Sequence, residues 1–453
     1  MANFQASTGD IKTSECDNSI IMNTITPQIL VFQIQDAHAR TLALINGLSD
    51  QQLMGPRLPI VNPLLWEIAH AAYFYEFFLL RSHLKEKPVR NDEDELYNSM
   101  TIAHNDRWDL PLPPIAETLQ YIQSILESTQ FSLSNGSDEQ RDYLAQYAIY
   151  HHDMHNEAFT YTRQTLDYPA PEISKPNHRI LDAGRLTGDS QIPGGQFQLG
   201  AREQDGFVFD NEKWANEVAV KPFSISRAAV SNADFLKFIE ADGYKNPAYW
   251  ENEGLEWLQQ SSQTCPLYWR NSDFGWQLKE FDEWKSLPLN AALIHVNWFE
   301  AQAYCKWARR RLPTELEWEV AAAAEPSADG QSLSSEKRYY PWGNQPPTQE
   351  YANLDGYALG TNDVAAHASG DSAFGCRQMI GNVWEWTATD FAPYPGFVPD
   401  MYEDYSQPLF GNTKVLRGGA WTTRGRMIRN TWRSYYGPER NDVFAGFRTC
   451  ALE

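Results

Sequence analysis

The chain has few basic residues for its length. Its 453 residues include 37 Lys and Arg against 59 Asp and Glu, which gives a formal net charge of -22. No run of Lys or Arg is long enough to form a basic stripe. Because proteins that bind nucleic acid hold its phosphates with basic surfaces, nucleic acid is not an expected partner.

Cysteines are also scarce, and they are scattered. They stand at Cys16, Cys265, Cys305, Cys376 and Cys450, and no two form a CxxC pair. This spacing favours neither a zinc knuckle nor a disulfide framework. We therefore expect reduced thiols and a cytoplasmic location.

Long hydrophobic runs are missing too. Stretches such as AAYFYEFFLL have about half the length that crosses a bilayer, and charged residues flank them. The start, MANFQASTGDIKTSECDNS, has neither the basic beginning nor the apolar core of a signal peptide. We expect residues 1–24 to form a disordered tail, and no membrane association.

What is present first is a helical pattern over residues 25–167. Apolar positions recur at steps of three and four at Leu30, Ile34, Ala37, Thr41, Leu44 and Leu48. Further helices are expected through LLWEIAHAAYFYEFFLLRSHL after Pro63, over 115–127 and over 138–166. Four long helices joined by loops predict a four-helix bundle.

The composition changes after the bundle, and the length of the chain suits two domains. The segment DYPAPEISKPNH contains three prolines that cannot continue a helix, so residues 168–188 are expected to be a linker. Residues 189–453 are rich in Trp, Gly and Asn, with short apolar runs between turn signals. This pattern predicts an irregular α+β domain, interrupted by helices over 231–241 and 298–310.

The stretch YHHDMHNEAF contains a pair of histidines with metal-ligand spacing. His151 and His155 are four apart, so they project from one face of the predicted helix. His70, in the middle of an apolar helix, is the candidate third ligand. Three neutral imidazoles suit iron, copper or zinc and leave coordination positions open. Hydrogen-bonded core histidines are the alternative.

Glu157 follows the pair in the same predicted helix. One interpretation is a carboxylate that accepts an N–H from a metal-bound imidazole and orients its ring. A solvated or helix-pairing carboxylate is the other.

Four C-terminal motifs resemble the formylglycine-generating-enzyme-like domain, a variant of the C-type lectin scaffold. They are RLPTELEWEVAAAA at 311–324, GNVWEWTATDF at 381–391, LRGGAW at 416–421 and FAGFR at 444–448. Formylglycine-generating enzymes carry a cysteine pair shortly after RGG, whereas this chain has AWTTRGRMIRNTW. Without that cysteine pair, formylglycine generation is not expected. The resemblance in fold does not change this expectation, because one fold can carry different functions.

Together with WEIAH and HHDMHNE in the bundle, these motifs resemble the ergothioneine-type sulfoxide synthases. The resemblance implies a DinB-like four-helix bundle followed by the lectin-like domain, with Fe(II) held by His70, His151 and His155. It also implies the substrates hercynine (Nα-trimethylhistidine), dioxygen and a thiol, cysteine or γ-glutamylcysteine. In that family sulfur is joined to C2 of the hercynine imidazole, and the metal supplies the oxidising power.

Some segments differ from the commoner members of the family. In RSYYGPERNDVFAGFR, Ser434, Tyr435 and Tyr436 fill the positions of an Asn-Trp-Asp run that touches the substrates, and Arg440 falls on the arginine that follows. Arg107 matches an arginine that contacts the thiol substrate. The resemblance implies that both arginines bind a substrate carboxylate. Surface salt bridges are the alternative.

Further site residues follow from the same resemblance. Met154 stands where relatives often carry a glutamine that touches hercynine. Candidate aromatic walls for the trimethylammonium group are Trp386, Tyr435 and Tyr436. The catalytic tyrosine of the family usually follows the WEW motif, where the available phenol is Tyr394. Phe391 occupies the position just after the motif, and if the family tyrosine aligns there, the proton comes from elsewhere.

These departures resemble a divergent branch, the selenoneine synthases, which form a carbon-selenium bond between hercynine and a selenosugar. The sequence leaves both the sulfur and the selenium donor open. A zinc-dependent thiol transferase of the DinB type and a non-catalytic lectin-like binding module are the alternative functions.

Overall fold

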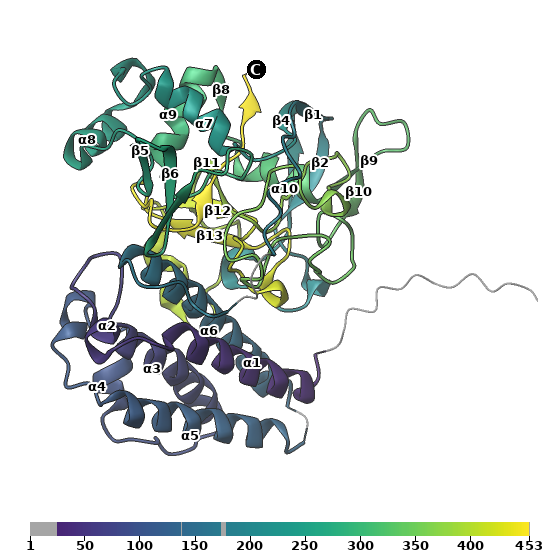
Figure 1. Cartoon of the computed structure of the whole chain (residues 1–453). Coiled ribbons are helices and arrows are strands. Elements are labelled where there is room, and N and C mark those ends of the chain that lie inside the picture. Colours follow the sequence, from purple (N-terminus) through teal and green to yellow (C-terminus); the bar gives the residue numbers. More distant parts are fainter. Residues whose placement is uncertain (1–24, 137, 174–177, 453) are drawn as a thin grey trace, which may run out of the picture.

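A computed structural model describes residues 25–136, 138–173 and 178–452. Figure 1 shows an all-helical domain packed against a mixed domain of short strands, helices and long loops. This confirms the predicted fold class, a helical bundle followed by an α+β domain. The predicted tail, residues 1–24, lies outside the described residues.

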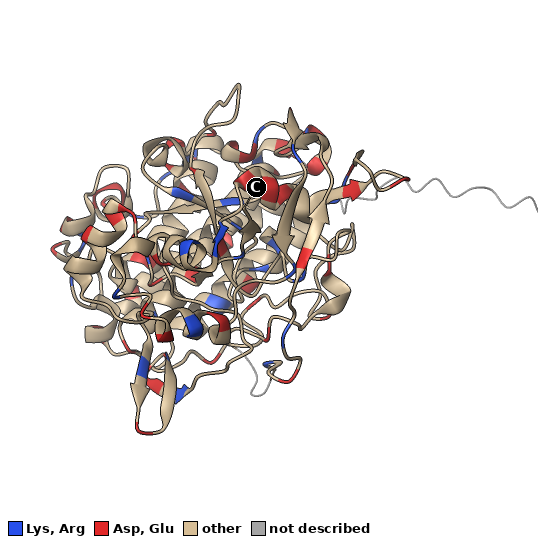
Figure 2. Cartoon of the chain, turned by 90° about the horizontal axis from the view of Figure 1, so that it is seen from above, with Lys and Arg blue, Asp and Glu red and all other residues tan. Residues whose placement is uncertain are grey.

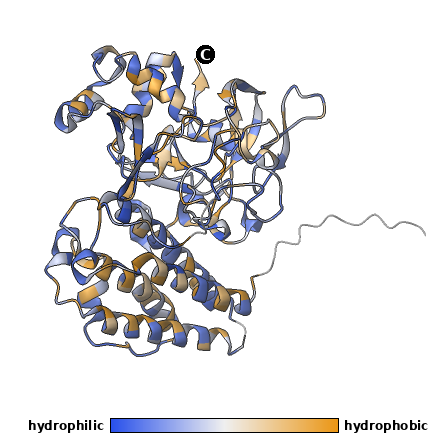
Figure 3. Ribbon diagram, viewed as in Figure 1, coloured by the Kyte–Doolittle hydropathy of each residue, from blue (hydrophilic) through white to orange (hydrophobic). Residues whose placement is uncertain are grey.

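Four long helical segments make the bundle, as the sequence predicts. The helices of this domain are Pro27–Ile45 (α1), Asp50–Met54 (α2), Leu64–Phe74 (α3), Glu93–Tyr97 (α4), Ile115–Leu133 (α5) and Glu139–Thr165 (α6). The four long segments are α1, α3 with its continuation, α5 and α6, whereas α2 and α4 are short. The stripe predicted on α1 is buried from Leu30 to Leu44. In Figure 3 these helices carry both orange and blue segments, as expected for helices with one buried face.

The second long segment changes its winding midway. α3 ends at Phe74, and a π-helix continues it over Tyr75–His83. The sequence predicts one continuous α-helix here, which is wrong in its second half. The residues of AAYFYEFFLL are apolar on almost every side of the helix, so the spacing of its apolar positions cannot distinguish one helical winding from another.

Two four-stranded sheets form the centre of the mixed domain, in the orders β1-β4-β15-β8 and β13-β12-β11-β14. The first contains Asp189–Ile192 (β1), Phe223–Ser226 (β4), Arg310–Arg311 (β8) and Cys450–Ala451 (β15). The second contains Trp384–Asp390 (β11), Lys414–Arg417 (β12), Arg433–Tyr436 (β13) and Ala445–Gly446 (β14). In the second sheet β12 pairs antiparallel with both β11 and β13, so two of the C-terminal motifs lie side by side.

Smaller sheets surround these. Their strands are Gly195–Leu199 (β2), Asn216–Val220 (β3), Trp269–Ser272 (β5), Gly275–Glu280 (β6), Glu283–Ser286 (β7), Ala324–Pro326 (β9) and Leu333–Lys337 (β10). Short 3-10 helices occupy His104–Trp108, Glu203–Asp205, Asp210–Glu212, Pro247–Tyr249, Ala368–Gly370, Glu403–Tyr405, Gln407–Leu409 and Gly425–Met427.

The helices of the mixed domain are partly as predicted. Asn232–Glu240 (α7) and Trp298–Ala308 (α9) confirm the two predicted helices. The sequence patterns did not predict Asn252–Ser261 (α8) or Glu315–Ala323 (α10). α10 is buried on nearly all sides, so it has no amphipathic stripe for a periodicity argument to find.

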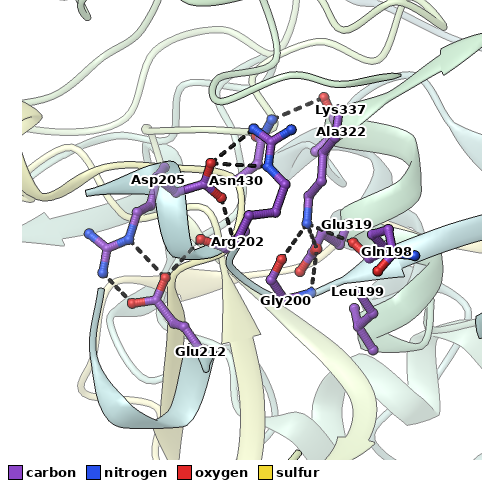
Figure 4. Close-up of polar contacts among 12 residues, drawn as sticks. Gln198, Leu199, Gly200, Arg202, Asp205, Glu212, Glu319, Ala322, Lys337 and Asn430 are labelled. Atoms are coloured by element: carbon purple, nitrogen blue, oxygen red, sulfur yellow. Dashed lines mark hydrogen bonds and ion pairs between the residues drawn. The ribbon is translucent and has the colours of Figure 1, made fainter. Parts of the chain in front are cut away.

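A buried ion network explains why the C-terminal motifs combine Arg with Glu. The side chain of Arg417 is fully buried and pairs with Glu315 at 2.7 Å and with Glu319 at 2.6 Å. Lys337 Nζ donates to Glu319 at 2.7 Å and to the Gly200 carbonyl at 2.6 Å (Figure 4). Removing one partner of a buried pair leaves an uncompensated charge. These motif residues therefore hold the domain together.

Charges of both signs are distributed over the fold. In the view of Figure 2, Lys and Arg segments alternate with Asp and Glu segments. Among the residues described, no helix is both long and apolar enough to span a membrane. Cys265, Cys305, Cys376 and Cys450 are free thiols.

Candidate metal centre and adjoining pocket

Three histidine side chains converge between α3 and α6. His151 and His155 lie one turn apart on α6, and His70 lies on α3. One nitrogen from each ring lies within 4.8 Å of the other two, and the Nε2 atoms of His151 and His155 are 3.2 Å apart. The fold thus brings together the three residues predicted as ligands, while their binding of a metal stays a prediction.

Neighbouring acceptors fix two of the rings. His70 Nδ1 lies 2.8 Å from the Tyr97 carbonyl oxygen, which can only accept, so this nitrogen carries the proton. His155 Nδ1 donates to the Glu67 carboxylate at 2.7 Å. In the neutral form of each ring, Nε2 is therefore the nitrogen left free to bind a metal.

Burial favours the neutral form of two of the three histidines, His70 and His151. It lowers the pKa of His70 and of His151 well below the usual value, and the nearness of His155 lowers both further. The His70 ring stacks on Trp66 with centroids 4.7 Å apart, and the His151 ring stacks on Phe74 at 4.0 Å. Neutral imidazole nitrogens held this way fit a divalent transition metal.

Glu157 does not orient an imidazole, so that interpretation is wrong. Its Oε1 accepts from Trp384 Nε1 at 2.7 Å, and its Oε2 accepts from the Thr423 hydroxyl. The carboxylate that orients a histidine is Glu67, which is only 3 % exposed. Because successive residues of a helix turn by about 100°, Glu157 faces away from the side of α6 that carries His155.

A pocket of about 150 Å³ lies between α6 and the mixed domain. Met154 and Glu157 line it from α6, and Ser434 lines it from β13. The aromatic side chains of the pocket are Trp384, Tyr405, Trp432, Tyr435 and Tyr436. The predicted residues Met154, Ser434, Tyr435 and Tyr436 are therefore neighbours around one pocket, and their contact with substrate stays a prediction.

Glu157 carries the unneutralised charge of this pocket. It forms no ion pair with any described residue, and burial raises its pKa, against the effect of the hydrogen bonds from Thr423 and Trp384. Asp153 also lines the pocket, but Arg426 neutralises it at 2.6 Å. A half-buried carboxylate among aromatic rings is complementary to a cationic ligand.

The two arginines predicted to bind substrate differ in availability. Arg107 donates to Asn62 Oδ1 at 2.6 Å, and its guanidinium lies 4.1 Å from the ring centre of Trp66. Arg107 has no ion pair with the part of the chain that the structure describes. Arg440 is already paired with Asp442 through two bonds of 2.6 and 2.7 Å. The charge of Arg107 is therefore the more available for an anionic group.

Two predicted site residues lie in the core of the mixed domain instead. Trp386 is fully buried on β11, and its indole N–H donates to the Val296 carbonyl at 2.9 Å. The Tyr394 ring packs against the guanidinium of Arg433 at 4.2 Å, and its buried hydroxyl has no partner among the described residues. Both side chains therefore support the core, and the roles of Trp386 as a substrate wall and of Tyr394 as the catalytic phenol stay predictions that this geometry does not favour.

Tyr402 is the phenol that the fold brings to the histidines, and no motif in the sequence indicated it. Its ring lies edge-on to His151 with centroids 5.9 Å apart, and it packs on Phe74 at 5.3 Å. Its hydroxyl lies 3.4 Å from Ser99 Oγ. Tyr402 follows β11 on an irregular loop, where no periodicity indicates which side chain turns toward the bundle.

The chain is similar to known proteins over nearly its whole length. Residues 33–164 match the DinB superfamily, and residues 181–452 match the sulfatase-modifying factor enzyme 1-like domain. The hercynine oxygenase of Mycolicibacterium smegmatis is 33% identical, over 94% of this chain and 99% of its own length. That of Mycobacterium tuberculosis is 34% identical, over 93% and 98%. A formylglycine-generating enzyme of Thermomonospora curvata is 30% identical, over 57% of this chain and 92% of its own.

The two domain matches have the order that the motifs imply, helical domain first. The full-length relatives are oxygenases, which sets aside the alternative of a non-catalytic lectin-like module. The chain is therefore an enzyme, and it belongs to the hercynine oxygenase family, of the ergothioneine-type sulfoxide synthase kind.

Proposed function

We propose that this enzyme uses Fe(II) and dioxygen to oxidise hercynine, replacing the C2–H bond of its imidazole with a carbon-sulfur or carbon-selenium bond. The observation that carries the proposal is Glu157, an unpaired carboxylate in an aromatic pocket, two residues from a histidine of the candidate metal centre. The full-length relatives are named for hercynine as substrate.

The pocket chemistry supports a trimethylammonium ligand. Such a group has no N–H to donate, so it is recognised by ring faces and by a carboxylate rather than by hydrogen bonds. Trp384 and Tyr436 supply ring faces, and Glu157 supplies the negative charge. The bonds from Trp384 and Thr423 hold this carboxylate in one orientation.

The histidine cluster supports an iron site beside that pocket. Fe(II) held by His70, His151 and His155 would bind dioxygen and supply the electron transfer that no side chain provides. Glu67 holds the His155 ring by its Nδ1–H. Met154 lines the pocket on the turn of α6 that carries the two histidines, so a substrate bound against it would lie near a metal held by them.

Arg107 supports binding of the chalcogen donor. Cysteine, γ-glutamylcysteine and a selenosugar all present oxygen atoms that a guanidinium can bind in pairs. Arg107 is fixed over Trp66, which itself stacks on His70, so an anchored donor would lie beside the metal. Arg440 would contribute less, because Asp442 already occupies its donors.

One assay tests the proposal. Iron-loaded enzyme is incubated with hercynine, dioxygen and one donor at a time: cysteine, γ-glutamylcysteine or a selenosugar. Product masses are then measured. We expect one donor to give a product joined to hercynine, and none to do so without dioxygen. Equal turnover under anaerobic conditions with zinc would favour the thiol transferase instead, and no adduct with any donor would contradict the proposal.

Replacement of Tyr402 by phenylalanine tests the phenol beside the histidines. If its hydroxyl delivers a proton, kcat is expected to fall by about 10²- to 10⁴-fold, with hercynine affinity nearly unchanged. The matched control is Tyr394→Phe, which removes a phenol from the core of the mixed domain. A Tyr402→Phe variant with the kcat and product ratio of the parent would remove Tyr402 from the mechanism.

Replacement of Glu67 by glutamine tests the group behind His155. Glutamine keeps the size of the side chain but weakens the acceptor for the Nδ1–H at 2.7 Å. Metal affinity is expected to fall about 10- to 100-fold, measured by competition with a chelating dye. Unchanged affinity in this variant would mean that the Glu67 contact does not tune the site.

A further inference from the structure

The segment Thr423–Arg426 joins the mixed domain to the bundle through charged side chains. It lies between β12 and β13 and includes the first two residues of the 3-10 helix Gly425–Met427. Figure 1 shows α1 and α6 on the side of the bundle that faces the mixed domain.

Arg426 connects two bundle helices at once. Its Nε and Nη2 donate to the two carboxylate oxygens of Asp153 on α6 at 2.6 and 2.8 Å. Its Nη1 donates to Asp36 on α1 at 2.6 Å. Arg424 also pairs with Asp36. Since the Asp153 side chain is fully buried and the Arg426 side chain is 13% exposed, this pair is well shielded from water.

The same segment contacts α6 at positions spaced as one helical face. The Tyr150 hydroxyl donates to the Arg426 carbonyl at 2.8 Å, and the Thr423 hydroxyl donates to Glu157. With Asp153, these positions follow steps of three and four, so they form one stripe along α6. His151 and His155 lie on the neighbouring stripe. The docked face of α6 thus fixes the direction in which the two histidines point.

We propose that Arg426 is a positioning residue that sets the rotation of α6 against the mixed domain, and so places the histidine cluster relative to the aromatic wall of the pocket. This inference rests on the proposed function, because the bundle would hold the metal and the mixed domain would hold much of the substrate. A misplacement of about 1 Å between reacting groups can lower a rate by about 10²-fold. Arg426 acts through α6 and does not touch the reacting atoms.

The test separates metal binding from substrate placement. All three histidines belong to the bundle, so Arg426→Gln is expected to bind Co(II), a spectroscopic substitute for iron, with an affinity within about twofold of the parent. Hercynine affinity is expected to fall about tenfold, and kcat by about 10²-fold. The change that hercynine causes in the Co(II) absorption spectrum should be smaller or shifted.

Two further variants complete the experiment. Arg426→Lys keeps the charge but not the two-point contact, so hercynine affinity intermediate between the parent and Arg426→Gln is expected; it carries the test if Arg426→Gln does not fold. Arg310→Gln removes another two-point pair, with Asp189 at 2.8 and 3.0 Å inside the mixed domain, and should leave hercynine affinity unchanged.

The outcomes distinguish the inference from the function on which it rests. Parent-like hercynine affinity and kcat in the folded Arg426 variants would overturn the positioning role. Parallel loss of Co(II) and hercynine binding would also overturn it, since that pattern indicates general damage to the fold. A parent enzyme that binds metal but not hercynine would instead overturn the proposed function.

Discussion

Replacement of His151 by alanine is expected to abolish turnover and to lower metal affinity by more than about 100-fold. Loss of a group that only orients a metal ligand lowers affinity by up to about 100-fold, so loss of a ligand itself should cost more. His151 lies within 4.8 Å of His70 and His155 by ring nitrogens, and its Nε2 is 3.2 Å from that of His155. Removing one of three imidazoles leaves two ligands, which hold a metal weakly. Metal content by elemental analysis and Fe(II) affinity by competition check this result.

His152→Gln is the matched control for this experiment. His152 is the next residue of α6, it is equally buried, and its Nε2 lies 2.7 Å from Thr41 Oγ1 rather than in the cluster. The control should melt at a lower temperature but keep the metal stoichiometry of the parent. If His151→Ala retains stoichiometric iron and the parent affinity, the histidine cluster is not the metal site.

Replacement of Glu157 by glutamine is expected to weaken hercynine binding by at least about 30-fold, or about 2 kcal/mol. Glutamine preserves the shape of the side chain and can still accept from Trp384, but it removes the negative charge facing the pocket. Free histidine serves as the comparison ligand. It lacks the three methyl groups and so carries no permanent trimethylammonium charge, and its affinity should fall less in the same variant. Isothermal titration of both ligands measures the difference.

Glu127→Gln removes the same charge from the exposed surface of α5, and it should leave both affinities unchanged. This control separates the local charge of the pocket from the net charge of the protein. Equal loss of hercynine and histidine affinity in Glu157→Gln would contradict a role in recognising the trimethylammonium group. Full retention of hercynine affinity would place that group elsewhere.

The sequence predicted the parts of the fold that repeat. The helical stripe from Leu30 to Leu44 and the spacing of His151 and His155 follow from helix geometry, so both could be recognised without a structure. The Arg and Glu residues of the C-terminal motifs indicated the domain, and the ion network around Arg417 shows why those residue types are needed. The buried helix α10 and the π-helix were not predicted, because neither has a continuous polar face that would reveal its helical period in the sequence.

By itself, then, the sequence determined two domains, their order, and three histidines able to meet at one point. Only the tertiary structure decided which side chains surround that point. Trp386 lies within the WEW motif and Tyr394 follows it, but both side chains turn into the core, while Tyr402 reaches His151 from an irregular loop. Glu157 lines the pocket and contacts Trp384 rather than an imidazole. The physical reason is that periodicity fixes directions within one helix or strand, whereas contacts across a domain interface depend on how loops and buried ion pairs dock the two domains.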